Sequence, residues 1–443
     1  MDIHFIRKNP QLVKENQIKR YSDPNLVDLI LNNDQYLGQL QFKTNKLRNL
    51  KNKLSESFKN ASDNETINFD DSYTFDSFIE DINNDQKTFN ELTKKQLSQL
   101  GKHINDMIND DDKLCKQLLM DRDQLISSLG NILHEDVIIN DSEDNNKIIY
   151  ETKISDNIEY KYSHNDLGKM LRIFDCESGI AISGNRGYFL TGIGVKLNMA
   201  LINYAIDFLE ERKYTLMQTP HIVTKELMSK ITQLSEYEET LYKLDGHDKF
   251  LIATSEQPLT AYFNDKQINK KDLPIRFGGL SECYRKETGR HGSQTLGIFR
   301  VHQFQKVEQF CVTEPEKSQD MFNEMIKTSQ DFYDSLGIEY RVVSIVSKAL
   351  NNAASIKYDI EAYFHGSKFY GELVSCTNCL DYFSKRLNTK IIGTKQCVHM
   401  LNCTLMANTR VLCCLMEQYQ TENGMKIPTV LQKYMNCDFI KFK

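Results

Sequence analysis

The sequence predicts an α+β protein in which an antiparallel sheet flanked by helices follows an antiparallel two-helix coiled-coil hairpin. Three observations predict this class. The N-terminal part is poor in glycine and proline and carries apolar residues at helical spacing. The rest mixes strand-like runs with helical patterns in no regular alternation, which favours an antiparallel sheet. The length of 443 residues indicates more than one domain.

Residues 1–136 are predicted to form the helical N-terminal domain. Apolar residues recur there in two stripes, mostly at steps of three and four, as expected for the facing sides of a helical hairpin. An ordinary helical bundle packed on the main domain fits the same spacing. The stripes consist of Leu47, Leu50, Leu54 and Phe58, and of Phe89, Leu92, Leu97, Leu100, Ile104, Met107, Leu114, Leu118, Leu125 and Leu129.

The two halves of the hairpin are separated by an acidic insert, residues 61–86. It contains eight Asp or Glu residues and no Lys or Arg, so we expect an extended tip or a partly disordered loop. Residues 39–60 are basic instead. Such a run usually forms a solvated helix face. The alternative is a surface that binds a polyanion, and the run alone does not distinguish the two. The basic residues concerned are Lys43, Lys46, Arg48, Lys51 and Lys53.

Residues 137–443 are predicted to form the second domain, with 137–186 as a connector. The glycines of residues 187–197 favour a turn. Residues 250–253, 300–310 and 341–346 have the pattern of strands, and residues 201–213, 317–336 and 409–419 that of helices.

Residues 300–310 place chemically active side chains at every second position. On a strand this spacing puts them on one face. Arg285 and Glu287 repeat the spacing on the preceding run, and a polar loop, residues 288–298, joins the two. Such a platform suits a polyanion, although a surface ladder of ion pairs would look the same. The alternating residues are Arg300, His302, Phe304, Lys306 and Glu308.

Three distant segments add polar residues beside apolar sequence. They are residues 254–256, residues 371–379 and the start of the helix predicted at 409–419. Groups that converge from separate segments are how small-molecule sites are built. The residues concerned are Thr254, Ser255, Glu256, Glu372, Ser375, Asn378 and Arg410.

Bulk properties narrow the classes of function. The net charge of −6 excludes a generally basic surface, so any RNA contact must be local. No apolar run approaches the roughly 18 residues that span a bilayer, and the N-terminus resembles neither a secretory signal nor a transit peptide. A single C-x-x-C pair, Cys376 and Cys379, is weak evidence for zinc, and we interpret it as structural.

The chain resembles the seryl-tRNA synthetases, a class II synthetase family, over almost its whole length except the acidic insert. M-Q-T-P-H at residues 217–221 is similar to the first class motif, C-Y-R-K-E with F-R-V-H-Q-F-Q-K-V-E-Q-F to the second, and N-C-T-L-M-A-N-T-R to the third. The run D-K-F-L-I-A-T-S-E-Q-P is typical of this family. The resemblance implies a class II catalytic domain and an N-terminal tRNA-binding arm.

The resemblance also implies a reaction, the ligation of serine to tRNA(Ser) through a seryl-adenylate made from ATP. Catalytic roles fall to Arg285, Glu372 and Arg410. Arg285 matches the arginine that bridges the α-phosphate and the serine carboxylate, and Arg410 the one on the terminal phosphate. Glu287 matches the reader of the adenine amino group, Phe304 the stacking residue, and Glu372 and Ser375 the ligands of Mg²⁺. Arg300 and Val301 complete the implied ATP site.

Serine itself has a second implied set of residues. Thr254 and Glu308 match the residues that hold its amino group, and Thr404 with Glu308 those that read its hydroxyl group. A buried reader of this kind rejects alanine, because alanine leaves polar groups unpaired. Arg285, Glu256 and Asn378 complete the set.

The resemblance implies serine, ATP and tRNA(Ser) as partners. The basic residues 43–53 would then bind the phosphates of the tRNA. We expect a cytoplasmic homodimer, with neither a membrane nor DNA as a partner.

The third motif departs from the family pattern. Small residues are usual where this chain has Cys403, Leu405 and Thr409, and larger side chains there would crowd ATP. The loop of the second motif reads S-Q-T-L-G, which removes cations usual in the family. An alternative therefore stays open, namely a catalytically impaired synthetase-like dimer that binds RNA or protein.

Overall fold

The structure is a computed structural model that describes residues 1–61, 67–155, 161–232, 239–288 and 297–443. Its contacts divide into two compact units. The hairpin unit comprises residues 3–14 and 24–129, and the core unit comprises residues 1–2, 15–23 and 130–443. The domains proposed from the sequence, 1–136 and 137–443, stay a proposal about domain organisation.

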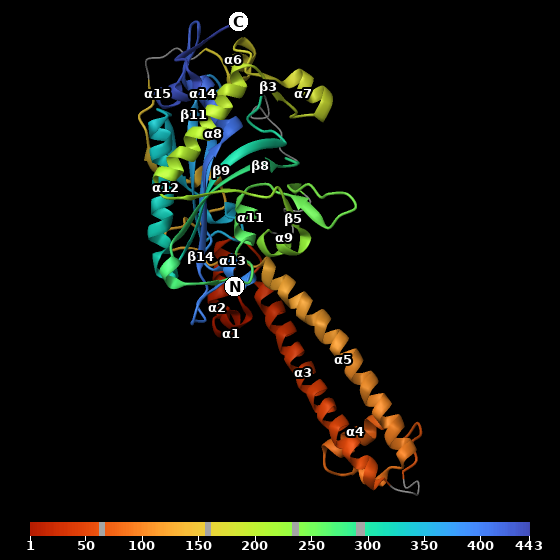
Figure 1. The fold of residues 1–443 in the computed structure, drawn as a ribbon. Helices are drawn as coiled ribbons and strands as arrows, with labels where there is room; N and C mark the ends of the chain where they lie inside the picture. Colours follow the sequence, from red (N-terminus) through yellow and green to blue (C-terminus); the bar gives the residue numbers. More distant parts are fainter. Residues whose placement is uncertain (62–66, 156–160, 233–238, 289–296) are drawn as a thin grey trace. The chain divides into compact units, whose positions relative to one another are not determined.

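Two long helices, α3 (Asn25–Ser57) and α5 (Lys94–Ser128), run side by side in the hairpin unit (Figure 1). Thr93 begins α5 with a capping box, because its hydroxyl accepts from the Gln96 amide while the Gln96 side chain accepts from the Thr93 amide. The unit also contains α1 (Ile3–Lys8) and α4 (Phe75–Asn83), and α2 (Pro10–Lys19) belongs to both units.

The predicted stripes are confirmed over most of their length. Leu47, Leu50 and Leu54 of α3 are buried against Leu97 and Leu100 of α5 in one apolar cluster, and each buried leucine contributes about 2 kcal/mol. The prediction is wrong for Leu114, which is 40% exposed. Beyond residue 108 the half-buried positions of α5 include the predicted Leu118, but also Asp111, Cys115 and Arg122, which are not apolar aliphatic residues.

The acidic insert is folded where the structure describes it, residues 67–86, which corrects the expectation of an extended or disordered tip. Helix α4 buries Phe78 and Ile79 in the same apolar cluster as the hairpin leucines. Asp76 and Glu80 of this helix are exposed, so the helix is amphipathic and its charge did not prevent folding. Residues 62–66 of the insert lie outside the described residues.

The core unit is built on a sheet of eight strands in the order β1-β10-β11-β12-β14-β9-β8-β4. Neighbouring strands are antiparallel, as predicted, except that β4 runs parallel to β8. The strands are β1 (Lys147–Glu151), β4 (Thr215–Gln218), β8 (Ile275–Tyr284), β9 (Gln303–Thr313), β10 (Tyr340–Ser344), β11 (Ile356–Phe364), β12 (Phe369–Asn378) and β14 (His399–Ala407).

The two faces of this sheet pack against different layers. Val307, Cys311 and Cys403 enter a large apolar cluster with α8 (Ile193–Glu211), α12 (Ser318–Ser335) and α14 (Asn408–Gln418). Phe310 and Met400, which have the opposite parity, enter a second cluster with α9 (Lys225–Ile231), α11 (Glu256–Ala261) and α13 (Tyr382–Arg386). Alternate residues of one strand therefore serve the two layers.

Short elements complete the core unit. In the described ranges no helix combines the length and apolar character that a membrane span requires. The short elements are β2 (Phe174–Asp175), β3 (Phe189–Leu190), β5 (Ile222–Thr224), β6 (Lys249–Leu251), β7 (Gln267–Ile268), β13 (Lys390–Ile391), β15 (Gln420–Thr421), β16 (Gly424–Lys426), β17 (Phe439–Lys441), α6 (His164–Met170), α7 (Cys176–Ser183) and α15 (Thr429–Met435).

Candidate active site

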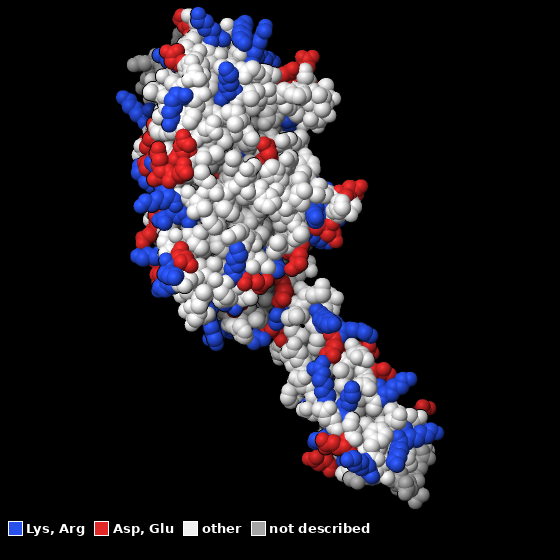
Figure 2. Space-filling model, viewed as in Figure 1, with Lys and Arg blue, Asp and Glu red and all other residues white. Residues whose placement is uncertain are grey.

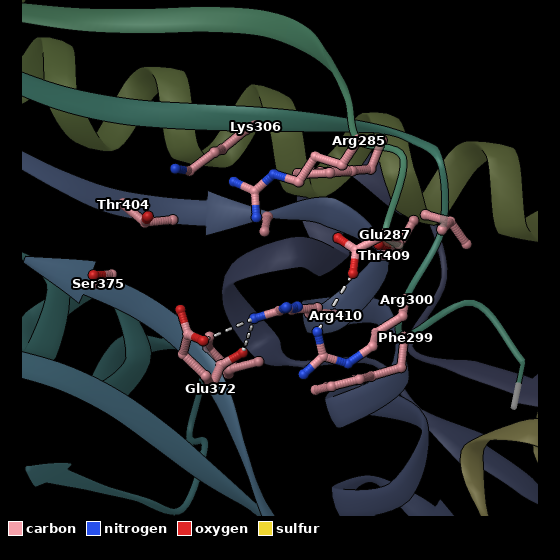
Figure 3. A pocket seen from close by; sticks show the side chains of 14 residues that line it. Arg285, Glu287, Phe299, Arg300, Lys306, Glu372, Ser375, Thr404, Thr409 and Arg410 are labelled. Atoms are coloured by element: carbon pink, nitrogen blue, oxygen red, sulfur yellow. Dashed lines mark hydrogen bonds and ion pairs between the residues drawn. The ribbon is translucent and has the colours of Figure 1, made fainter. Parts of the chain in front are cut away.

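A pocket opens on the sheet face that carries α9, α11 and α13, over strands β9, β14 and β12 (Figure 3). Its wall carries cations, carboxylates and aromatic rings, which suits a ligand that has both a phosphate group and an aromatic ring. It is lined by Arg285, Glu287, Phe299, Arg300, Val301, Phe304, Lys306, Glu372, Leu373, Ser375, Thr404, Ala407, Thr409 and Arg410. All eight residues expected to bind ATP are among them.

Two irregularities in strand register shape the pocket. On β12 the pairing with β11 passes from Val374 to Glu372, so that Leu373 is the extra residue of a bulge. Glu372 and Ser375, three residues apart, would face opposite sides of a regular strand. The bulge brings both to the pocket, where a carboxylate and a hydroxyl oxygen lie on one wall.

The same device occurs on β14. Thr404 pairs with Glu308 of β9, and the next paired residue is Met406, which leaves Leu405 as the extra residue. Thr404 and Ala407 consequently both line the pocket. Leu405 and Cys403 enter the apolar cluster on the other face of the sheet, so neither crowds the pocket. Of the three unusual residues of the third motif, Thr409 is the one that reaches it.

Arg285 and Glu287 follow directly after β8. The Arg285 amide donates to the carbonyl oxygen of His302 at 2.9 Å, its Nε donates to the Ala253 oxygen at 3.2 Å, and its guanidinium lies 5.2 Å from the centre of the Phe304 ring. Glu287 has a positive φ of 52°. This left-handed conformation is uncommon outside glycine and is often found at functional sites.

The Glu287 carboxylate lies between two arginines. Arg300 is 3.5 Å and Arg186 is 3.7 Å from its Oε2, and Arg186 also donates to the Glu287 backbone oxygen at 2.9 Å. These contacts fix the direction of a carboxylate that is only 10% exposed. A carboxylate held in this way can accept a hydrogen bond from an amino group of a ligand.

Glu372 sits among cations. Burial raises the pKa of its carboxyl group, but the charges of Arg410, Lys357 and Arg285 outweigh that effect and lower the pKa to about 2. Arg410 Nη1 lies 3.5 Å from the carboxylate and donates to the Glu372 backbone oxygen at 2.8 Å. The site therefore holds an ionised carboxylate beside the guanidinium groups that a phosphate would need.

A second group of residues lies deeper along β9. Lys306 Nζ is 2.5 Å from Oε2 of Glu308 and donates to the Thr254 hydroxyl at 3.3 Å. Glu308 is buried, and burial raises the pKa of its carboxyl group despite the opposing charges of Lys306 and Arg285. Lys306 thus joins two residues expected to hold serine, and Thr404 is the strand neighbour of Glu308.

Three of the predicted positions lie elsewhere. Asn378 has the parity of Cys376, whose side chain enters the opposite face, and its Oδ1 accepts from the Leu380 amide. Glu256 receives a hydrogen bond from Asn402 at 2.8 Å and does not line the pocket. His302 accompanies Tyr242 in a neighbouring cavity, because β9 begins only at Gln303 and the alternation predicted from Arg300 fails before it.

Sequence reasoning missed three residues of the site. Lys306 was noticed only for its spacing, Phe299 lies 5.1 Å below the Arg410 guanidinium, and Arg186 arrives from far upstream. Alternation along the strand placed Lys306 on the same face as Phe304 and Glu308 but gave it no role. Nothing local to the sequence indicated Arg186. The loop predicted at 288–298 lies largely outside the described residues, since 289–296 are not described.

The cysteine pair does not form a ligand set. Cys376 belongs to one apolar cluster and Cys379 to the other, so the two thiols lie in different layers. Burial raises the pKa of both thiols well above the ordinary value. Within the described part of the chain, no three His, Cys, Asp or Glu side chains are grouped so as to hold a metal ion by themselves.

The five basic residues expected to meet RNA all lie on the exposed surface of α3. Lys43 pairs with Asp111 at 3.6 Å, and Arg48 makes two hydrogen bonds with Asp112, at 2.7 and 2.8 Å. Among the described residues, neither Lys51 nor Lys53 forms an ion pair with an acidic side chain. Figure 2 shows acidic side chains among the basic ones along this unit.

Comparisons with known proteins agree on one family. The chain matches the seryl-tRNA synthetase N-terminal domain over residues 1–107 and the class II tRNA synthetase core domain (G, H, P, S and T) over residues 237–419. It is 51% identical over 325 residues to the cytoplasmic serine–tRNA ligase of Dictyostelium discoideum, which covers 71% of each chain.

Two solved structures are similar throughout. The crystal structure of a cytoplasmic serine-tRNA ligase from Naegleria fowleri in complex with AMP has a TM-score of 0.86 and 41% identity, covering 100% of this chain and 99% of that one. A seryl-tRNA synthetase from Pyrococcus horikoshii complexed with ATP has a TM-score of 0.85 and 31% identity, covering 100% of both chains.

Proposed function

The chain belongs to the seryl-tRNA synthetase family, and from this premise we propose that it ligates serine to tRNA(Ser) through a seryl-adenylate made in the pocket over β9, β12 and β14. One observation carries the assignment to this pocket. Residues from four separate segments, expected from sequence to bind ATP, line it together. Its mixture of guanidinium groups, carboxylates and an aromatic ring suits a nucleoside triphosphate.

In the first step the serine carboxylate attacks the α-phosphate of ATP and pyrophosphate leaves. Negative charge accumulates on phosphate oxygens, so the protein acts mainly by positioning and by electrostatic stabilisation. Arg285 is proposed to bridge the carboxylate and the α-phosphate, and its anchoring to Ala253 and His302 fixes its direction. Arg410 is proposed to meet the terminal phosphate.

The adenine ring has a proposed seat between Phe304 and the carboxylate of Glu287. Phe304 offers the face of its ring, and Glu287 accepts a hydrogen bond from the exocyclic amino group. The two arginines beside Glu287 support this role, because their contacts fix the position of its carboxylate. A guanine ring carries a carbonyl oxygen at that position and would be repelled.

Mg²⁺ is a proposed companion of ATP. Glu372 and Ser375 provide hard oxygen donors on one wall, which is the chemistry that Mg²⁺ prefers. Two protein ligands fit an ion that is held jointly with phosphate oxygens, as is usual for Mg²⁺ with nucleotides. When bound, such an ion would shield phosphate charge.

Serine selectivity is proposed to rest on Glu308, Thr254 and Thr404. Glu308 is buried beside Thr404 across the β9–β14 pair, so a serine hydroxyl there would meet both groups. Alanine would leave these polar atoms unpaired, which can discriminate by about 10⁴-fold.

The second step transfers serine to the 3′ end of the tRNA, and the hairpin unit is proposed to bind the tRNA body. Lysines on exposed α3 suit phosphate contacts. We place the enzyme in the cytoplasm, as the names of its relatives indicate for them.

A homodimer is proposed from the surface of the core unit. Figure 2 shows a broad area with few charged side chains in the middle of this unit. Apolar side chains are exposed on α8, β4 and β5, which lie close together in sequence around the first class motif. They are Val195, Met199, Leu216 and Ile222, each between 38% and 47% exposed. Large exposed apolar patches mark association surfaces.

The decisive test is amino-acid-dependent exchange of pyrophosphate into ATP, run with all standard amino acids. Exchange with serine alone supports the proposal and shows that Cys403, Leu405 and Thr409 are tolerated. A folded protein that exchanges with no amino acid is instead a synthetase-like binding protein. Exchange with a different amino acid would refute the assigned specificity.

A further inference from the structure

The ammonium group of Lys306 lies in the serine end of the pocket. It is 2.5 Å from Oε2 of Glu308 and 3.3 Å from the hydroxyl of Thr254, and its side chain is 10% exposed. Lysine ammonium groups at such burial are rare unless paired. Here the partners are Glu308 and Thr254, to which the resemblance to the seryl-tRNA synthetases assigns the α-ammonium group of serine.

Two ammonium groups compete for one carboxylate at this point. The α-ammonium of serine and the ε-ammonium of lysine carry the same charge and the same three donors. One buried carboxylate neutralises one of them, and a second unpaired cation beside it would be costly in a poorly hydrated site. The substrate and the side chain cannot both keep the position that Lys306 occupies.

We propose, on the basis of the function proposed above, that Lys306 fills the ammonium subsite of the empty enzyme and that serine displaces it toward the ATP phosphates. The lysine is an internal stand-in for the substrate's ammonium group and contacts Glu308 and Thr254 until the substrate arrives. Figure 3 shows Lys306 extended along the pocket wall beside the Arg285 guanidinium and above Thr404. A rotation of its side chain carries the charge along that wall.

The destination of the displaced charge follows from the surroundings. Lys306 lines the same pocket as Arg285 and Glu372, and its charge is felt at the Glu372 carboxyl group. A lysine released from Glu308 adds a second cation where carboxylate and α-phosphate react. The second cation therefore reaches the α-phosphate only when serine is bound. Without serine, the attack of water on ATP lacks this cation and is disfavoured.

A crystal structure of the full chain with a non-hydrolysable seryl-sulfamoyl adenosine tests the displacement directly. We expect the ammonium of this analogue to contact Glu308 and Thr254, with Lys306 beyond ion-pair distance of Glu308 and turned to the sulfamoyl group. The proposal is overturned if Lys306 keeps its contact with Glu308 in the complex.

Kinetics of Lys306→Met test the consequence, with Lys327→Met as the matched control. Lys327 forms an exposed ion pair with Asp331 on α12, away from the pocket. At pH 8.5, where an unpaired Glu308 ionises more readily, we expect kcat for serine-dependent exchange to fall about 100-fold while KM for serine does not rise. A raised serine KM at unchanged kcat would make Lys306 a fixed counter-ion and refute displacement.

These outcomes are separable from a failure of the proposed function. If the wild-type chain shows no serine-dependent exchange, the function fails before Lys306 is considered. If the wild type exchanges with serine and Lys306→Met behaves like Lys327→Met, only the inference about Lys306 fails.

Discussion

Arg410 holds Glu372 at two points, through a hydrogen bond of 2.8 Å to its backbone oxygen and an ion pair of 3.5 Å to its carboxylate. One guanidinium group thereby links the first helical turn of α14 to the bulge of β12. The carboxylate is 44% exposed to the pocket while its cationic neighbours keep it ionised. The relationship fixes the wall on which phosphates are proposed to lie.

Arg410→Lys is expected to lower kcat/KM for ATP by about 10- to 100-fold. Lysine keeps the charge but has no planar fork, so it cannot hold Glu372 and a phosphate together. Serine- and ATP-dependent pyrophosphate exchange measures the effect. An unchanged KM for ATP would show that Arg410 serves the fold alone.

Arg285→Ala is expected to abolish adenylate formation, with a loss of at least about 10³-fold in exchange, because the bridging cation disappears from the reacting centre. Circular dichroism should show an intact fold. Arg276→Ala is a useful control, since Arg276 lies on β8, the strand that Arg285 follows, but pairs with Glu324 outside the pocket. Full activity of Arg285→Ala would place the reaction elsewhere.

Lys51→Gln combined with Lys53→Gln is expected to raise KM for tRNA and to reduce the salt dependence of tRNA binding by about one unit of slope per lost phosphate contact. Pyrophosphate exchange should not change, because that step does not need tRNA. Aminoacylation at several salt concentrations checks this. If the double variant charges tRNA normally, these two lysines face solvent only.

Phe78→Ala is expected to destabilise the hairpin unit by about 3 to 4 kcal/mol, since its ring is fully buried in the hairpin cluster. Met120→Ala, at a residue that is 66% exposed, is the control. Thermal unfolding followed by circular dichroism measures the difference. We expect pyrophosphate exchange to persist while tRNA charging weakens, and equal stability of the two variants would contradict the packing of α4.

Asp34 gives the hairpin unit a predictable response to acid. Burial raises the pKa of its carboxyl group, but Arg7 at 2.6 Å and Arg122 at 3.1 Å outweigh burial and hold the pKa below its usual value. A depressed pKa means stability that is present above the unfolded value of about 3.9 and lost as pH falls through the folded value.

Asp34→Asn is therefore expected to cost about 2 kcal/mol near neutral pH, less than a fully buried pair because Arg7 is half exposed. The difference from wild type should shrink below about pH 4. Urea unfolding between pH 7 and 3 measures it, with Asp110→Asn as an exposed control. A difference that grows on acidification would reverse the assigned sign.

The local sequence pattern was sufficient to predict many of the secondary-structure elements of this protein. The 3.6-residue period located the leucine seam of α3 and α5, since burying one face of a helix needs only that spacing. The long strand β9 and helices α12 and α14 followed from the same kind of reasoning. The resemblance of the motifs to those of the seryl-tRNA synthetases implied the ATP-site residues, whereas alternation along a strand indicated only that Phe304, Lys306 and Glu308 share one face.

Which residues share a face of the sheet or a pocket depends on tertiary structure and cannot be predicted from periodicity. Bulges at Leu373 and Leu405 change which residues share a face, and a bulge depends on pairing with another strand rather than on local sequence. They let Glu372 and Ser375 line the pocket together, and likewise Thr404 and Ala407. The acidic insert folded because Phe78 found apolar partners on helices distant in sequence.

The sequence by itself thus determined the kind of protein, its elements and its reactive residues, all of which depend on local order along the chain. Only the folded chain decided which of those residues meet. Arg186 reaches Glu287 across about a hundred residues of sequence, and Lys306 takes the place proposed for a substrate's ammonium group. Both contacts join segments that are distant in sequence. Bringing such segments together costs conformational entropy, and this cost is offset only when the core of the whole unit has packed.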